Sequence, residues 1–422
     1  MREQVKALRG TKDLLPVEAK LWTTLEAKAR AVLNAFCYKE VRTPVMEESS
    51  LFVRSLGAGT DIVEKQMFTF IDRGERSITL RPEATASVVR AYLENNLVNE
   101  YGFIKLFYMG PMFRAERPQA GRMRQFHQIG VEALGSYSPQ LDAEVIALIS
   151  ALLESLGVHG SIIKINSLGC PKDKTALADG LRKTLAGGQD RLCEDCRARY
   201  EKNVLRILDC KNDSCRKLVR MIFKGTPESL CPDCKSHFDS VKSSLDGLKI
   251  NYTVDPYLVR GLDYYTKTTF EVTHKKLGAQ DAIGAGGRYD NLVEELGGPA
   301  KGACGFAIGM ERAAMAMDDS PEIRDGICLY FATMGEEEYR VAFNFANELR
   351  TRGGISCELD YEGKSLKAQM RSADRLGAKY VAMIGEEELK NRTLTLRNMA
   401  TKEQKVIPER EFIPEIERIF VK

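Results

Sequence analysis

The stretch Ile104–Leu134 reads IKLFYMGPMF-RAERPQAGRMR-QFHQIGVEAL, with two extended apolar segments on either side of a polar loop. The first segment is Ile104–Phe113 and the second is Gln125–Leu134. When two strands are joined by so short a loop, they form an antiparallel pair, because a parallel pair needs a longer crossover connection. The stretch therefore predicts an antiparallel hairpin.

The hairpin carries the densest polar cluster of the chain, which consists of Arg114, Glu116, Arg117, Arg122, Arg124, Gln128 and Glu132. Side chains alternate along a strand, so Arg124, Gln128 and Glu132 share one face, and His127 lies on the other. Arginines gathered on a sheet match phosphate oxygens with their forked donors. The alternative is a solvated hairpin tip with ordinary surface charges.

The composition limits the class of protein. With 422 residues, of which 44% are apolar, the chain is long enough for two or three domains. The 62 basic and 59 acidic residues leave a net charge of +3, which excludes a uniformly basic nucleic-acid-binding surface but not a local basic patch. No apolar run reaches the ~18 residues of a membrane span, and the polar start does not suit a secretion signal. A cytoplasmic protein with reduced cysteines is expected.

The rest of the chain divides into regions of different composition. An amphipathic helix over Val17–Phe36 and a strand over Tyr38–Met46 are predicted before the hairpin. Beyond a linker at 318–321, strands and helices alternate, which indicates a small α/β domain with a parallel sheet core. The predicted domains are residues 1–169 together with 251–322, a helical insertion at 170–250, and a C-terminal domain at 323–422.

Two further segments suggest a ligand site. Leu258–Tyr265 reads LVRGLDYY, and Gly284–Asp290 reads GAGGRYD, where glycines allow the backbone to approach a ligand closely. Each could serve packing or turns alone, but their occurrence together with the arginine-rich hairpin favours binding. The glycine-rich motifs of P-loop and dinucleotide-binding proteins are missing from the sequence.

These segments resemble the motifs of bacterial histidyl-tRNA synthetases, a family of class II aminoacyl-tRNA synthetases, over essentially the whole length. Thr79–Glu83 (TLRPE), Met112–Glu132 and Gly305–Arg312 (GFAIGMER) resemble the substrate loop and two class motifs. Arg260–Tyr265 and Gly284–Asp290 resemble the two histidine-specific signatures. The resemblance implies an α+β fold with an antiparallel catalytic sheet, a helical insertion and a C-terminal α/β anticodon-binding domain.

The resemblance also implies the reaction. Histidine is activated with ATP to histidyl-adenylate and pyrophosphate, and the histidyl group then passes to tRNA(His), with Mg²⁺ on the ATP phosphates. Arg260 and Arg114 are implied to be catalytic, and Arg312 to reach the γ-phosphate. The ATP-binding residues implied are Arg114, Glu116, Arg122 and Arg312. The histidine-binding residues implied are Glu83, Thr85, Gln128, Glu132, Tyr264, Tyr265 and Tyr289, with Ala84 where a glycine is expected.

Basic residues at spacings of three and four predict a stripe on one helix of the C-terminal domain: Lys364, Lys367, Arg371, Arg375 and Lys379. By charge pattern alone this is a solvated helix face; by resemblance, Lys364, Lys367 and Arg371 bind tRNA, as does Gln119. The resemblance further implies a homodimer whose interface includes residues 17–45.

The insertion carries Cys210-x-x-x-x-Cys215 and two C-x-x-C pairs, Cys193/Cys196 and Cys231/Cys234, which lie about 35 residues apart. They resemble a structural zinc site, but reduced thiols are the alternative, the family does not require zinc, and no metal ligand is assigned among the site residues.

Three rival functions are open to a chain of this kind. One is a non-catalytic paralogue that regulates ATP phosphoribosyltransferase, and another is a tRNA-binding sensor without turnover. The third is another class II synthetase with the same C-terminal domain, which the segment Arg260–Tyr265 disfavours.

Overall fold

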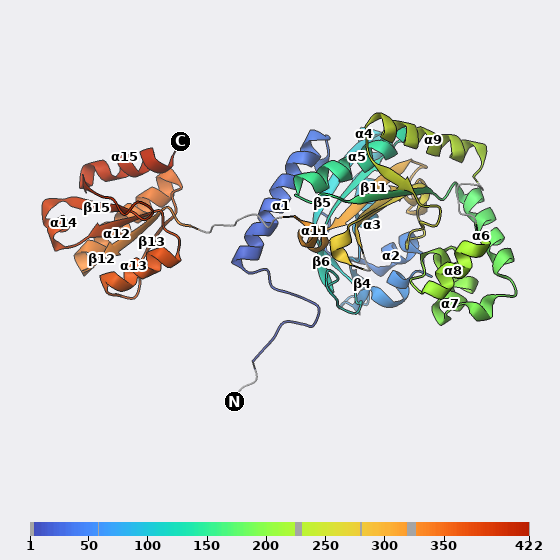
Figure 1. Ribbon diagram of the computed structural model, residues 1–422, viewed down its shortest axis with the longest axis horizontal. Coiled ribbons are helices and arrows are strands. Elements are labelled where there is room, and N and C mark those ends of the chain that lie inside the picture. Colours follow the sequence, from blue (N-terminus) through green and yellow to red (C-terminus); the bar gives the residue numbers. More distant parts are fainter. Residues whose placement is uncertain (1–3, 58, 224–229, 279–280, 319–325, 422) are drawn as a thin grey trace. The chain divides into compact units, whose positions relative to one another are not determined.

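The computed structural model describes residues 4–57, 59–223, 230–278, 281–318 and 326–421. The chain divides into two compact units, Met1–Ser320 and Pro321–Lys422 (Figure 1). The predicted linker at 318–321 lies outside the described residues except for Asp318. Within the described ranges, every helix is too short or too polar to cross a membrane.

The first unit is built on an eight-stranded sheet in the order β1-β5-β6-β11-β10-β9-β7-β8. Its strands are β1 (Lys39–Glu40), β5 (Ile104–Phe113), β6 (Gln125–Leu134), β7 (Ile162–Ser167), β8 (Tyr252–Val254), β9 (Thr266–Thr273), β10 (Ala282–Arg288) and β11 (Ala303–Gly309). All pairs are antiparallel except β1·β5 and β7·β8 at the two edges. The predicted hairpin is confirmed, because β5 and β6 pair antiparallel with Leu106 opposite Glu132 and Gly110 opposite Gln128.

Helices cover both faces of this sheet. On one face, a core forms beneath α1 (Pro16–Ala35), α5 (Pro139–Ser155), α9 (Pro232–Gly247) and α11 (Met310–Ala316). On the other face lie α2 (Ser49–Leu56), α3 (Thr85–Glu94), α4 (Leu97–Tyr101), α10 (Leu292–Glu295) and most of the insertion. The alternation along β6 divides its residues between the two faces. Ile129, Val131 and Ala133 join the first core, which leaves Gln128 and Glu132 on the second face, as the sequence predicts.

The single strand expected over Tyr38–Met46 is wrong. The segment contains β1, which joins the large sheet, and the start of β2 (Met46–Glu48), which pairs with β4 (Ser77–Leu80) in a three-stranded sheet completed by β3 (Phe68–Ile71). Pro44 lies between them and has no N–H to donate to a ladder. The Arg81 guanidinium donates to the carbonyl oxygens of Thr43 and Pro44 at 3.0 and 3.4 Å, so these groups are satisfied by a side chain instead of a strand.

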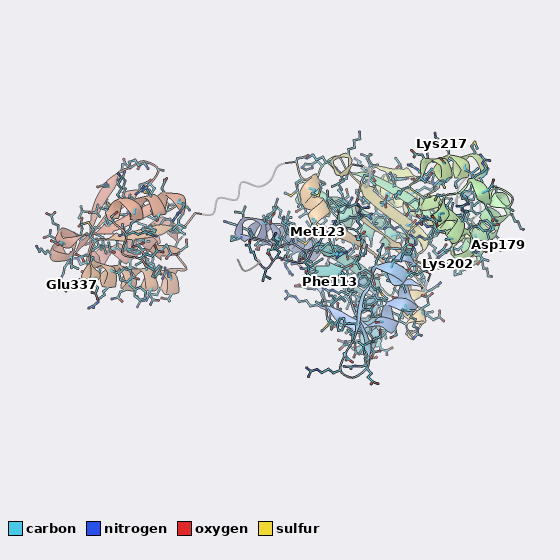
Figure 2. All side chains as sticks on the ribbon, turned by 90° about the horizontal axis from the view of Figure 1, so that it is seen from below. Phe113, Met123, Asp179, Lys202, Lys217 and Glu337 are labelled. Atoms are coloured by element: carbon cyan, nitrogen blue, oxygen red, sulfur yellow. The ribbon has the colours of Figure 1, made fainter. Side chains whose placement is uncertain are left out.

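The insertion is helical, as predicted. Its helices are α6 (Pro171–Leu185), α7 (Glu194–Lys202), α8 (Asp213–Ile222) and α9, with two 3₁₀ turns, η2 (Gln189–Arg191) and η3 (Val204–Asp209). Figure 2 labels Asp179 on α6, Lys202 on α7 and Lys217 on α8. Leu181, Leu185 and Ile207 pack into the same core as α2 and α3, so the insertion forms part of the first unit.

The second unit is the small α/β domain that the sequence predicts. Its sheet has the order β13-β12-β14-β15-β16, with strands β12 (Leu329–Thr333), β13 (Cys357–Leu359), β14 (Tyr380–Ile384), β15 (Thr393–Asn398) and β16 (Gln404–Pro408). The first three strands form the expected parallel core, and β15 and β16 extend it antiparallel. The helices are α12 (Glu336–Gly353), α13 (Leu366–Arg375), α14 (Glu386–Asn391) and α15 (Glu409–Phe420).

Candidate functional site

A cavity of about 350 Å³ opens on the second face of the large sheet. It contains every residue that the sequence predicts for ATP and amino-acid binding: Glu83, Thr85, Arg114, Glu116, Arg122, Gln128, Glu132, Arg260, Tyr264, Tyr265, Tyr289 and Arg312. Glu83 and Arg312, which are about 230 residues apart in the sequence, both line this cavity, so the fold brings distant segments together.

Glu132 is the central carboxylate of one group of lining residues. It is 1% exposed, and it accepts a hydrogen bond at 2.7 Å from the Thr85 hydroxyl and another from the Tyr289 hydroxyl. A Cβ atom at Gly305, on the neighbouring strand, would lie 2.2 Å from the Glu132 carboxylate, so only glycine leaves room for it there. Burial raises the pKa of Glu132 to about 8, although the two hydroxyl donors oppose the rise.

Glu83 is the second buried carboxylate of the cavity. Its oxygens accept from the backbone N–H groups of Thr85 at 2.7 Å and Ala86 at 3.0 Å, so it caps the start of α3. Burial raises the pKa of Glu83, and these N–H donors oppose the rise. Ala84, where a glycine was expected, has φ −115° and ψ −10°, a conformation open to any L-residue. The methyl group therefore causes no backbone strain.

Three tyrosines wall this part of the cavity. The ring centroids of Tyr264 and Tyr265 are 4.7 Å apart, and those of Tyr264 and Tyr289 are 5.5 Å apart. Gln128 also lines the cavity, and its buried Oε1 has no hydrogen-bond partner among the described residues. With two carboxylates and an unpaired amide oxygen, this group is rich in acceptors and suits a small ligand that carries N–H donors.

Guanidinium groups form the other part of the cavity lining. Arg114 donates to the Pro82 carbonyl at 2.9 Å and lies over the Phe126 ring at 5.2 Å. Arg260 donates to Glu271 at 2.9 Å, and Arg312 donates to the Ala282 carbonyl at 2.5 Å. Burial lowers the pKa of both Arg114 and Arg312, and repulsion from Arg122 lowers both further. Cations held this close together fit a ligand with several negative charges, such as a polyphosphate.

Some lining residues escaped the sequence prediction: Tyr108, Phe126, Asp209, Lys211, Glu271, Asp281 and Glu311. The alternation that places Gln128 on the cavity face also places Phe126 there, so this residue could have been found. Asp209 and Lys211 come from the insertion, and nothing local in the sequence signals that they reach the cavity. Glu311 accepts from the backbone N–H of His127 at 2.9 Å, which ties α11 to β6.

The glycine cluster at 284–287 serves sheet packing more than ligand contact, which corrects the interpretation from sequence. Gly284 lines the cavity, but a Cβ on Gly286 would lie 2.2 Å from the Gly305 carbonyl oxygen. A Cβ on Gly287, whose φ is +154°, would lie 2.5 Å from the Thr268 carbonyl oxygen. The two glycines are needed because neighbouring strands approach closely.

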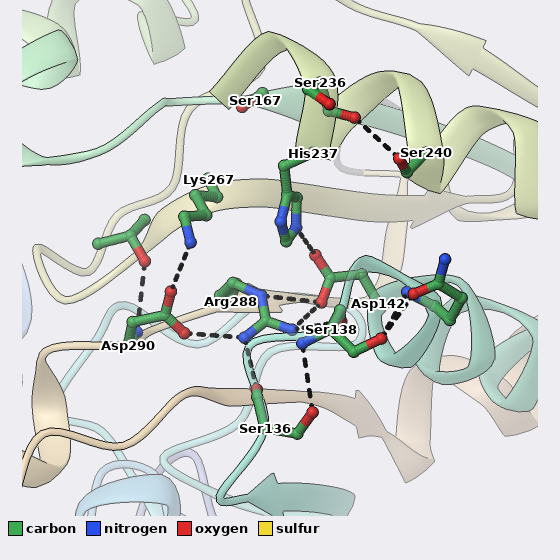
Figure 3. A network of polar contacts seen from close by, with 12 residues as sticks. Ser136, Ser138, Asp142, Ser167, Ser236, His237, Ser240, Lys267, Arg288 and Asp290 are labelled. Atoms are coloured by element: carbon green, nitrogen blue, oxygen red, sulfur yellow. Dashed lines mark hydrogen bonds and ion pairs between the residues drawn. The ribbon is translucent and has the colours of Figure 1, made fainter. Parts of the chain in front are cut away.

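Arg288 follows this cluster and points away from the cavity into a buried polar network (Figure 3). Its guanidinium donates to Asp142 on α5 and, at 2.8 Å, to Asp290. Asp142 also bonds His237 of α9 at 2.8 Å. Although burial opposes it, the Arg288 charge and the His237 bond hold the pKa of Asp142 below its usual range. The network joins the last helix of the insertion to the eight-stranded sheet.

The basic stripe predicted over five residues is shorter than expected. Helix α13 spans Leu366–Arg375 and carries only Lys367, Arg371 and Arg375, all exposed. Lys364 precedes the helix and pairs with Glu362 at 2.7 Å, and Lys379 follows it. The helical spacing in the sequence predicted that all five residues share one face, but the helix begins after Lys364 and ends before Lys379. Gln119, in the first unit, lies exposed in the β5–β6 loop.

Comparisons with known proteins identify relatives of both units. The family model "Histidyl-tRNA synthetase" matches residues 10–173 and 229–313, and the model "Anticodon binding domain" matches residues 329–419. The histidine–tRNA ligase of Halothermothrix orenii is 51% identical over 421 residues, covering 98% of this chain and 99% of that protein. The histidine–tRNA ligase of Natranaerobius thermophilus is 45% identical, with the same coverage.

Solved structures resemble the whole chain. The apo histidyl-tRNA synthetase of S. aureus has a TM-score of 0.81 and 37% identity, covering 98% of this chain and 100% of that chain. A Bacillus halodurans protein described as an ATP phosphoribosyltransferase regulatory subunit/histidyl-tRNA synthetase has a TM-score of 0.66 and 21% identity, covering 91% of this chain and 99% of that chain. That second likeness concerns the fold alone.

Proposed function

The chain belongs to the histidyl-tRNA synthetase family, and on this premise we propose how its cavity performs the reaction. The enzyme is a ligase that activates histidine with ATP and transfers the histidyl group to tRNA(His). The observation that carries the proposal for the site is that an acceptor-rich group around Glu132 and a guanidinium group share one cavity of about 350 Å³. The acceptors suit the ammonium and imidazole N–H groups of histidine, and the guanidinium groups suit the phosphates of a nucleoside triphosphate bound beside it.

The acceptor-rich group binds histidine. Glu83 and the unpaired Oε1 of Gln128 accept from the substrate ammonium, with Thr85 nearby. A neutral imidazole offers one donor and one acceptor nitrogen, which Glu132 and Tyr264 satisfy. Tyr265 and Tyr289 pack against Tyr264, and the three rings define the shape of the pocket. An isostere without both ring nitrogens leaves buried polar groups unpaired and is rejected.

The guanidinium group binds ATP. Arg114 holds the α-phosphate and Arg312 the γ-phosphate, while Glu116 and Arg122 complete the nucleotide site. The histidine carboxylate oxygen attacks the α-phosphorus, the bond to the bridging oxygen breaks, and pyrophosphate leaves. Arg260 stabilises the negative charge that spreads over the α-phosphoryl oxygens during this displacement.

Mg²⁺ fits the same part of the cavity. Glu271 and Asp281 line it close to Arg312, and Mg²⁺ is bound through one or two carboxylates together with substrate phosphates. These two residues would hold the ion, which neutralises phosphate charge when it is bound. The Oε2 atom of Glu271 also accepts from Arg260 at 2.9 Å, so one carboxylate serves both cations.

Amino-acid-dependent ATP–pyrophosphate exchange tests the proposed function. We expect exchange with histidine to exceed exchange with any other standard amino acid by about 10²-fold or more, because the pocket satisfies both ring nitrogens. Aminoacylation of tRNA(His) should follow at a comparable rate. A regulatory paralogue or a tRNA sensor would show no exchange, and a different class II synthetase would exchange with another amino acid.

We propose that the exposed basic residues of α13 bind tRNA phosphates. Reversing Lys367 and Arg371 to glutamate should raise the KM for tRNA(His) by about tenfold and weaken its salt dependence, because phosphate contacts are lost. Pyrophosphate exchange does not need tRNA and should be unchanged. The matched control reverses Arg340 and Arg410, exposed residues of α12 and α15 in the same unit. An unchanged KM for the α13 variant contradicts this role. Lys364 and Gln119 are proposed as further tRNA contacts.

We also propose a cytoplasmic homodimer. Apolar side chains are exposed along the segment at 15–46 and on the small sheet beside it, including Leu15 (66% exposed), Val17 (60%), Met46 (55%) and Ile71 (65%). Burial of such a surface against a second copy is favourable. All eleven cysteines carry free thiols, as is usual in a reducing compartment. Sedimentation equilibrium decides between the dimer and a monomer.

A further inference from the structure

The cysteines of the insertion gather in two separate groups, which corrects the pairing suggested by the sequence. Cys193 and Cys196 meet Cys210 and Cys215, whereas Cys231 and Cys234 meet Cys170 and Asp173. Within each group the potential ligand atoms lie within 4.8 Å of one another. The two C-x-x-C motifs therefore do not share one site. The first group consists of thiols alone and is the stronger candidate.

The geometry of the first group suits a tetrahedral metal. The Sγ atoms of Cys193 and Cys210 are 3.8 Å apart. Four thiolates about 2.3 Å from a zinc ion lie about 3.8 Å from one another at the corners of a tetrahedron. A disulfide would require about 2.05 Å, and all four thiols are free. Cys196, Cys210 and Cys215 are buried, so the site is closed, as structural zinc sites are.

Backbone donors point at these sulfur atoms. The N–H of Cys193 donates to the Cys215 Sγ at 3.2 Å, and the N–H of Asn212 donates to the Cys210 Sγ at 3.4 Å. Such bonds stabilise the negative charge of metal-bound thiolates and fix their orientation. Cys193 precedes α7 and Asn212 precedes α8, so two separate loops direct backbone N–H groups at the sulfur atoms.

The elements that carry the thiols are short. Helix α7 spans nine residues, and Cys196 is its only buried residue. Helix α8 spans ten residues, and η3 spans six. They pack against the core shared with α2 and α3, and a metal ion would also tie them to one another. We propose that Cys193, Cys196, Cys210 and Cys215 bind one structural zinc ion.

The zinc site holds a wall of the cavity in place. Between the two halves of the site, Asn203 donates to Asp263 at 2.7 Å and Arg206 to Asp61 at 2.8 Å. Asp209 and Lys211, on either side of Cys210, line the cavity next to Arg260. The metal thus connects the fold of the insertion to the position of these residues, whatever substrate the cavity binds.

The second group has a structural explanation that needs no metal. Cys170 and Cys231 precede the first residues of α6 and α9, and Asp173 accepts from their backbone N–H groups at 3.3 and 3.1 Å. One carboxylate therefore caps two helices. Cys231 is a matched control for Cys193, because each is half-buried, precedes a helix and begins a C-x-x-C motif.

X-ray absorption at the zinc edge of the full-length wild-type protein tests the proposal without a substitution. Protein produced with zinc supplementation and purified without chelators should contain zinc with four sulfur neighbours at about 2.3 Å. Zinc-free protein, or a coordination shell that contains oxygen or nitrogen, would overturn the assignment.

Two variants locate the ion. Cys193→Ser should lower the zinc content by about one ion per chain and expose the 193–215 segment to limited proteolysis. Cys231→Ser should retain the ion with four sulfur neighbours. If Cys193→Ser keeps the zinc content and spectrum of the wild type, the proposal is wrong. If Cys193→Ser fails to fold, the X-ray absorption spectrum of the wild-type protein still shows whether zinc is bound by four sulfur atoms.

Discussion

Replacing Arg260 with alanine is expected to lower the rate of histidine-dependent pyrophosphate exchange by about 10²–10³-fold, because a cation aimed at the reacting phosphate is lost from a desolvated site. Arg260 is oriented by its 2.9 Å bond to Glu271, and its Nε has no partner among the described residues, which leaves donor capacity for a substrate. Arg260→His should lose nearly as much, since the shorter imidazole cannot reproduce the forked donor geometry.

The kinetics of Arg260→Ala should separate a catalytic role from a structural one. A charge that acts on the transition state lowers kcat and leaves the KM for ATP within a few-fold, whereas a fold defect lowers the melting temperature. Arg220→Ala is the control, because Arg220 lies over the Tyr257 ring at 5.5 Å and does not line the cavity. If Arg260→Ala catalyses pyrophosphate exchange at nearly the wild-type rate, the catalytic role assigned to Arg260 is wrong.

Replacing Glu132 with glutamine is expected to lower kcat/KM for histidine by about 10²-fold. The Thr85 and Tyr289 hydroxyls both donate to the carboxylate, and the amide can accept from only one of them. The amide also replaces one of the two side-chain oxygens that we propose face the imidazole with an NH2 group, which cannot accept a hydrogen bond. Glu144→Gln serves as the control, because Glu144 pairs with Lys105 at 2.5 Å outside the cavity. Unchanged kcat/KM in Glu132→Gln would contradict its role in histidine binding.

The same variant should alter the pH dependence of stability. Burial raises the pKa of Glu132 from 4.5 to about 8, so the folded protein holds this proton more tightly than the unfolded chain does. The resulting stabilisation is present below pH 4.5 and is lost as the pH rises to about 8. Because glutamine does not titrate, the melting temperature of Glu132→Gln minus that of the wild type should increase over this interval. A constant difference would show that Glu132 does not titrate there.

Sequence alone determined the parts of the protein whose signals are local. Alternation along Gln125–Leu134 predicted the hairpin and which residues share its cavity face, because side chains of a strand alternate between faces by covalent geometry. The alternating strands and helices after residue 326 likewise predicted the parallel core of the second unit. The motifs around Arg114, Arg260 and Arg312 identified the family and twelve of the residues that line the cavity.

Only the tertiary structure decided which distant groups meet. It divided the cysteines of the insertion into two groups, paired Arg288 with Asp142, and brought Lys211 to the cavity wall. It also buried Glu132, which changes the acidity of a side chain that looks ordinary in the sequence. The physical reason is that local periodicity fixes the face of an element on which a residue lies, whereas partners, burial and hence electrostatic environment depend on how the elements pack.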